Sequence, residues 1–256
     1  MDAFIATFGI AGLVYASLSM AAGGFAKGVV GFALPLVGLS LMASFLPGKT
    51  ALALLLLPIL ISNLLQALRN GGREAWDCLR KFWRLNLVFV LVLVLAAQLV
   101  VVMSDAMLYA VLGVVITTAG VTQLLGWRPR FAPRYNRLAE VITGALCGVL
   151  GGIAGIWGPP LIMYLLAIHA PKLEMIRAQS ITFFIGAVLL LVAHTHSGIL
   201  NATTLPVSAL MVVPTLAGMF VGYGVQDKLD QELFRRATLI VLVVSGLNLL
   251  RRAAGF

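Results

Sequence analysis

The sequence predicts an all-α polytopic membrane protein, on two observations of composition and one of pattern. Hydrophobic residues make up 61% of the 256 residues, whereas charged residues make up only 11%; a soluble domain has about 25% charged residues. The apolar residues also stand in long runs, several above the roughly 18 residues that span a bilayer as a helix. Because the alternating polarity of a transmembrane barrel is absent, we expect membrane-spanning helices and a lipid bilayer as the first partner.

Eight long apolar segments and two short ones are expected. The short segments, 31–46 and 158–169, each follow a glycine-rich stretch and contain a proline near their start. Proline is well tolerated in the first turn of a helix, because the N–H that it lacks would have no helical partner there. The long segments are residues 4–26, 49–69, 84–103, 106–126, 137–155, 173–196, 204–224 and 234–250.

Charged or polar turns separate these segments. The loop 69–84 contains five lysines and arginines, and Ser104-Asp105 is the only interruption between two spans. A loop with four arginines and two prolines, residues 128–137, lies near the middle of the chain. We therefore divide a single membrane domain into a first repeat, residues 1–127, and a second repeat, residues 128–256.

The two repeats share their glycine and proline pattern at an offset of 124 residues. Five coincidences fall within 24 positions, more than the 26 glycines and 10 prolines of the chain would produce by chance. Such internal similarity is typical of secondary transporters built from two structural repeats. The matched pairs are Gly24/Gly148, Gly28/Gly152, Gly31/Gly155, Pro35/Pro159 and Pro47/Pro171.

Loop charge predicts that the two repeats are inverted. The five-charge loop 69–84 corresponds to 193–208, which contains no lysine or arginine, whereas Ser104-Asp105 corresponds to a basic loop near Lys228. Cytoplasmic loops collect lysine and arginine, so equivalent loops should lie on opposite sides of the membrane. Five crossings per half satisfy this pattern. If the two short segments re-enter instead of crossing, the chain crosses eight times and the halves are parallel.

The two glycine-rich breaks are the predicted substrate site. Interrupted backbone is tolerated at membrane depth only where protein or a water-filled cavity surrounds it, and the N-terminus of a half-helix attracts an anion. The alternative is close helix packing through small residues four apart, such as Gly24 and Gly28. The glycines assigned to the substrate site are Gly28, Gly31, Gly151, Gly152 and Gly155.

Five further side chains near the breaks complete the predicted site. Lys27 and Arg177 are the cations closest to them, and either contacts an anion or anchors its helix at the interface, where Arg177 could also pair with Glu174. Trp157 either lines the cavity or anchors at the membrane surface. Gln179 and Ser180 follow Arg177 and could donate hydrogen bonds, although such groups more often join helices.

Other classes of protein lack their signatures in this sequence. No helix carries two histidines and a glutamate at metalloprotease spacing, and Cys78 and Cys147 fit no ligand or redox spacing. We therefore predict no enzyme activity, no metal and no cofactor. The net charge of +9 comes from loops beside spans, as the positive-inside rule expects, so we predict no nucleic-acid partner.

The chain resembles the sulfite exporter TauE/SafE family, also called the toluene sulfonate uptake permease family. The resemblance rests on GFAKGVVGFALPL from Gly24, on GVLGGIAGIWGPPLIMYLL from Gly148, and on KLEMIRAQSITFF from Lys172, and it covers nearly all of the chain. It implies a multi-pass permease of a prokaryotic inner membrane for small anions such as sulfite or sulfoacetate. Lys27 interrupts the glycine run of the family, which leaves open whether both breaks bind substrate alike.

We therefore expect a secondary transporter for a small sulfur-containing or carboxylate anion. Replacing Lys27 or Arg177 with glutamine should abolish transport. A cation or metal permease is the first alternative, and a membrane-embedded enzyme or assembly factor without transport activity is the second. The direction of transport, the coupling ion (proton or sodium) and the choice between a monomer and a homodimer are left open by the sequence.

Overall fold

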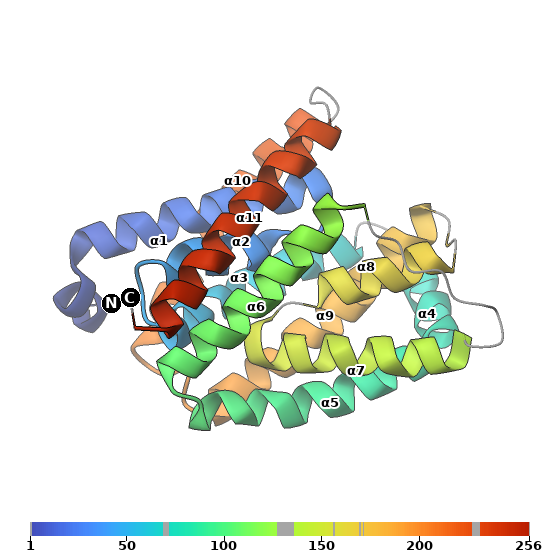
Figure 1. Cartoon of the computed structure of the whole chain (residues 1–256), viewed down its shortest axis with the longest axis horizontal. Coiled ribbons are helices and arrows are strands. Elements are labelled where there is room, and N and C mark those ends of the chain that lie inside the picture. Colours follow the sequence, from blue (N-terminus) through green and yellow to red (C-terminus); the bar gives the residue numbers. More distant parts are fainter. Residues whose placement is uncertain are drawn as a thin grey trace. The chain divides into compact units, whose positions relative to one another are not determined.

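All regular secondary structure that the structure describes is α-helical (Figure 1). The structure is a computed structural model, and it describes residues 2–68, 72–126, 136–155, 157–168, 170, 172–226 and 231–255. The helices are α1 (Asp2–Val30), α2 (Leu34–Ala43), α3 (Gly48–Leu68), α4 (Gly72–Lys81), α5 (Trp83–Val102), α6 (Asp105–Leu124), α7 (Asn136–Ala154), α8 (Gly158–Ala167), α9 (Lys172–His196), α10 (Thr204–Gln226) and α11 (Gln231–Ala253).

Five helices among the described residues are long and apolar enough to cross a membrane, within α1, α3, α6, α9 and α10. A sixth span is counted if α4 and α5, which are bent by 84° at their junction, form one broken span. This agrees with the predicted class of multi-pass helical membrane protein. Two finer points stay predictions: the division of the chain into eight long and two short membrane segments, and the inverted orientation of the two repeats.

The contacts of the chain divide it into two compact units. Unit 1 consists of Met1–Ile59, Val102–Gly126 and His194–Phe256, and unit 2 of Leu60–Val101 and Trp127–Ala193. Unit 1 therefore contains α1, α2, α6, α10 and α11 with the first part of α3, and unit 2 contains α4, α5, α7, α8 and nearly all of α9. The proposed division at residue 127 separates two repeats of similar sequence. The contacts within the structure do not test that division.

Glycines set the distance between α1 and α10 in unit 1. A Cβ atom built on Gly24 would lie 2.0 Å from the carbonyl oxygen of Thr215, and one on Gly28 would lie 2.3 Å from that of Met219. Both distances are well below van der Waals contact, so the two helices approach as closely as glycine alone permits. Such small-residue contacts drive helix association in membranes, where the hydrophobic effect contributes little.

The equivalent helix of unit 2, α7, packs against α5 in a similar way. A Cβ on Gly144 would lie 2.5 Å from the carbonyl oxygen of Leu85, and one on Gly152 would lie 2.7 Å from that of Leu93. The small-residue pattern that the sequence analysis treated as an alternative to a substrate role is thus used for helix packing in both units.

Helix α4 corrects the prediction of a plain loop over residues 69–84. Cys78 and Phe82 are buried and lie one helical turn apart, while Arg73, Glu74 and Arg80 are exposed. This is the amphipathic pattern of a surface helix. The charge of the segment concealed it, because five cations within a short stretch suggested only a cytoplasmic turn.

Helix boundaries repeat at the offset found in the sequence. Moved by 124 positions, α2 falls on α8 from its first residue to its last, and the last residue of α1, Val30, falls on Ala154, the last of α7. Likewise, α3 and α9 begin at equivalent residues, and α5 and α10 end at equivalent residues. Within the described ranges α4 is the helix without a counterpart, since residues 197–203 are not helical.

Candidate functional site

The two glycine breaks have the same local geometry. Helix α1 ends before Gly31, which has a φ of 89°, and its N–H donates to the carbonyl of Lys27 at 2.7 Å. Helix α7 ends before Gly155, which has a φ of 66°, and its N–H donates to the carbonyl of Gly151 at 2.8 Å. A glycine in the left-handed region with this bond is a common way to end a helix. Each break is followed after two residues by a ten-residue helix, α2 or α8.

Lys27 lies in the last turn of α1 and is only 2% exposed. It follows Ala26, which is also buried, and precedes Gly28, which contacts α10. The structure therefore encloses this side chain in protein, in place of the surface anchoring that the sequence analysis kept as an alternative. A cation inside a membrane-spanning helix is costly and is usually retained for function, so Lys27 is the main feature of the first break.

Trp157 is the main feature of the second break, between α7 and α8. It is 2% exposed, and its ring lies 6.0 Å from the rings of both Phe89 and Phe183. Its carbonyl accepts a hydrogen bond from the Cys147 thiol at 3.3 Å. Gly151 provides space for this ring, since a Cβ there would lie 2.8 Å from it. Trp157 thus fixes the break against α5 and α9 and is not a surface anchor.

Arg177 has a partner that the sequence did not indicate. Its guanidinium lies 2.7 Å from the Glu74 carboxylate of α4. Glu174, three residues before Arg177, pairs with Lys81 of α4 at 2.6 Å. The alternative pairing of Arg177 with Glu174 on the same helix is therefore not the one observed. Two ion pairs of opposite polarity join α4 to the start of α9.

The other two predicted site residues on α9 are Gln179 and Ser180. Gln179 is buried, at 8% exposure. Ser180 lies within α9, but its side chain is outside the described part of the structure. Thr182 and Phe183 follow Gln179 by three and four residues, respectively. These three positions therefore share one face of the helix.

Asn86 and Thr182 are buried polar residues that the sequence analysis missed. The Thr182 hydroxyl donates to the side-chain oxygen of Asn86 at 2.9 Å, and the Asn86 amide donates to the carbonyl of Phe82 at 3.0 Å. On the same face of α9, the Phe183 carbonyl accepts from Asn63 of α3 at 3.2 Å. In the sequence, these residues are visible only as single polar positions within apolar runs. That pattern does not indicate which polar side chains form hydrogen bonds with one another.

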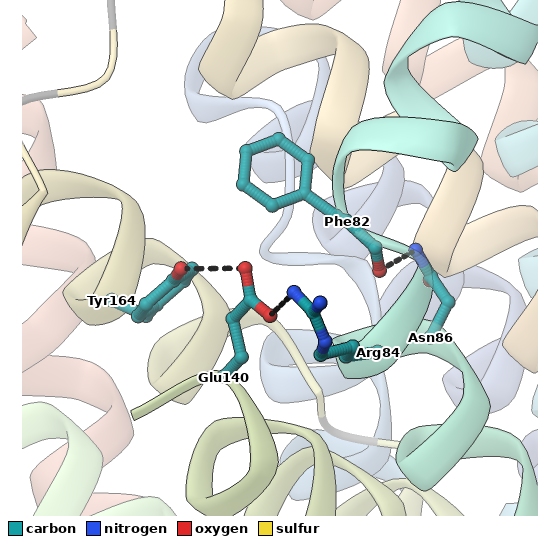
Figure 2. A network of polar contacts seen from close by, with 5 residues as sticks. All are labelled: Phe82, Arg84, Asn86, Glu140 and Tyr164. Atoms are coloured by element: carbon teal, nitrogen blue, oxygen red, sulfur yellow. Dashed lines mark hydrogen bonds and ion pairs between the residues drawn. The ribbon is translucent and has the colours of Figure 1, made fainter. Parts of the chain in front are cut away.

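Near Asn86, the junction of α4 and α5 also lies beside the Glu140 carboxylate, as Figure 2 shows. Arg84 lies 3.8 Å from Glu140 of α7, and Tyr164 of α8 donates to the same carboxylate at 3.4 Å. Phe82 packs its ring edge-on against Tyr164, with the centroids 6.4 Å apart. Within unit 2, Phe82, Arg84 and Asn86 therefore contact α8, α7 and α9, respectively.

Cys78 lies on the buried side of α4, outside the five candidate spans. Burial raises the pKa of its thiol to about 11, and the nearby Glu174 carboxylate acts in the same direction. Because the thiolate is the reactive form of cysteine, this burial disfavours reaction at Cys78, which packs on the buried side of α4.

The apolar helices, among which lie the two glycine breaks and several buried polar side chains, define a multi-pass α-helical membrane protein. The particular family follows from comparison with known families. The family model for the sulfite exporter TauE/SafE matches residues 15–249, nearly the whole chain. The protein therefore belongs to the TauE/SafE family. Comparisons with curated proteins and with solved structures gave no significant match.

Proposed function

We propose that the protein is a secondary transporter that moves a small sulfur-containing anion, sulfite or a sulfonate such as sulfoacetate, across the inner membrane. Membership of the TauE/SafE family is the observation that carries this proposal. The enclosed amine of Lys27 and the two glycine breaks support it, since an anion is attracted by an ammonium group and by the N-terminus of a half-helix.

The substrate-binding residues that we propose are those predicted from the sequence. Lys27 supplies the amine at the first break, and Gln179 supplies a buried side-chain amide on α9. Arg177 is a second cation of the set, although it is shared with Glu74. The complete set is Lys27, Gly28, Gly31, Gly151, Gly152, Gly155, Trp157, Arg177, Gln179 and Ser180.

The proposal is tested by counterflow in proteoliposomes. Vesicles that contain the purified protein and are loaded with unlabelled sulfite or sulfoacetate should accumulate the same labelled anion from outside, and protein-free vesicles should not. Taurine and a simple carboxylate serve as competitors that define the substrate class. If none of these anions exchanges while a metal cation does, the proposal is wrong and the cation permease is the correct alternative.

Replacing Lys27 with glutamine should lower counterflow about tenfold or more, because hydrogen bonds to charged groups contribute about 1.5–3 kcal/mol. The variant should still be recovered from the membrane as folded protein, since glutamine is only one atom shorter than lysine and keeps a polar end. Arg73→Gln is the matched control, because it removes one cation from an exposed position at the start of α4 and should leave counterflow unchanged. Wild-type rates in the Lys27 variant would remove Lys27 from the site.

A further inference from the structure

Glu140 differs from the other paired carboxylates of unit 2 in its exposure. Its side chain is 13% exposed, compared with 24% for Glu174 and 45% for Glu74. It lies in the second turn of α7, whose next turn packs Gly144 against α5. An ionised group in such a position requires good partners, because desolvation strongly disfavours an uncompensated charge.

The partners of Glu140 are nevertheless weak. The ion pair with Arg84 spans 3.8 Å, compared with 2.6 Å for Lys81 and Glu174 and 2.7 Å for Arg177 and Glu74. A separation of 3.8 Å is too long for a hydrogen bond. The Oε2 atom of Glu140 is buried and receives no hydrogen bond from any described residue, while Oε1 accepts one from Tyr164 at 3.4 Å. Oε2 is therefore an open position for a proton.

Glu140 and its hydrogen-bond partner Tyr164 lie on opposite sides of the second break along the chain, and Figure 2 shows them next to each other. Glu140 is on α7, before the break, and Tyr164 is on α8, after it. Among the described residues, Arg84 from α5 and Tyr164 from α8 contact Glu140, and Tyr164 in turn lies within electrostatic range of Glu174 of α9. A change in the charge of Glu140 consequently acts on α5, α7 and α8 together.

We propose that Glu140 binds the proton that is coupled to anion transport, an inference that rests on the proposed function. A proton from solution adds to Oε2, so the carboxylate becomes a neutral acid and no longer balances the positive charge of Arg84. The uncompensated positive charge of Arg84 then favours binding of the substrate anion by electrostatic attraction. One proton and one anion bind together and move in the same direction, and release of both restores the ion pair between Arg84 and Glu140.

The test compares two assays on the same proteoliposomes. Wild-type protein should accumulate labelled sulfoacetate when the vesicle exterior is made acidic, and its counterflow should depend on pH. Glu140→Gln should lose accumulation by at least about tenfold, while its remaining counterflow no longer varies with pH. Glu174→Gln is the matched control, because it also neutralises a paired glutamate of unit 2 but should keep both the accumulation and the pH dependence.

The outcomes separate this inference from the proposed function. If the wild type exchanges sulfoacetate but a pH gradient drives no accumulation, or if Glu140→Gln accumulates it like the wild type, Glu140 is not the proton site although the protein is an anion transporter. If Glu140→Gln does not fold, the purified wild type decides: adding sulfoacetate in weak buffer should take up about one proton per protein, and no uptake overturns the proposal. No exchange of any anion overturns the proposed function itself.

Discussion

Replacing Gly24 with alanine is expected to lower the free energy of unfolding by about 3 kcal/mol, at the upper end of the cost of overpacking a core. The added Cβ would lie 2.0 Å from the carbonyl oxygen of Thr215 and 2.8 Å from its carbonyl carbon. These are backbone atoms in the middle of α10, so no side chain can turn aside and the two helices must separate. The loss is measured as a lower apparent melting temperature of the purified protein in detergent.

The same helix pair supplies the controls for this prediction. Gly218 faces α1 from the opposite side, with its Cβ position 2.0 Å from the carbonyl oxygen of Ala21, and Gly218→Ala should destabilise the protein as much. Gly224 is in the same helix but has no atom within 4 Å of its Cβ position. Since alanine favours a helix over glycine by up to about 1 kcal/mol, Gly224→Ala should be neutral or stabilising. Equal melting of all three variants would contradict the close packing of α1 and α10.

The glycine breaks could be predicted from the sequence because their cause is local. Gly31 and Gly155 each precede a proline by four residues, and both adopt the left-handed conformation that ends a helix. The same reasoning placed the short helices α2 and α8 after them. The helix-ending role of a glycine can thus be inferred from the residues next to it. The helix that it packs against cannot, because the contact of Gly24 with α10 and that of Gly152 with α5 depend on the three-dimensional fold.

The polar contacts of unit 2 could not be predicted, because they join residues far apart in the chain. Arg177 meets Glu74 and Lys81 meets Glu174, although Glu174 stands only three positions from Arg177 in the sequence. The amphipathic character of α4 was also concealed by its charges. Likewise, nothing in the local sequence of Glu140 indicates Arg84 and Tyr164 as its neighbours.

Replacing Trp157 with alanine is expected to cost about 3–5 kcal/mol, the usual loss when a large buried aromatic side chain is truncated. The indole is 2% exposed and contacts the rings of Phe89 and Phe183. Gly186 makes room for the same cluster, since a Cβ there would lie 2.6 Å from the Phe89 ring. No small group within this cluster can fill the space left by the indole, so a cavity should remain beside the second break.

The control for this prediction is Trp76→Ala, because Trp76 is 55% exposed on α4 and its loss opens no cavity. Trp157→Phe should recover part of the stability, since a phenylalanine ring still contacts Phe89 and Phe183. Melting temperatures measure packing, and counterflow of sulfoacetate measures the role of the break in transport. If Trp157→Phe restores stability but not counterflow, the indole contributes to the substrate site directly; if both return together, Trp157 acts by holding α8 against α5 and α9. Wild-type melting of Trp157→Ala would contradict the buried position of the indole.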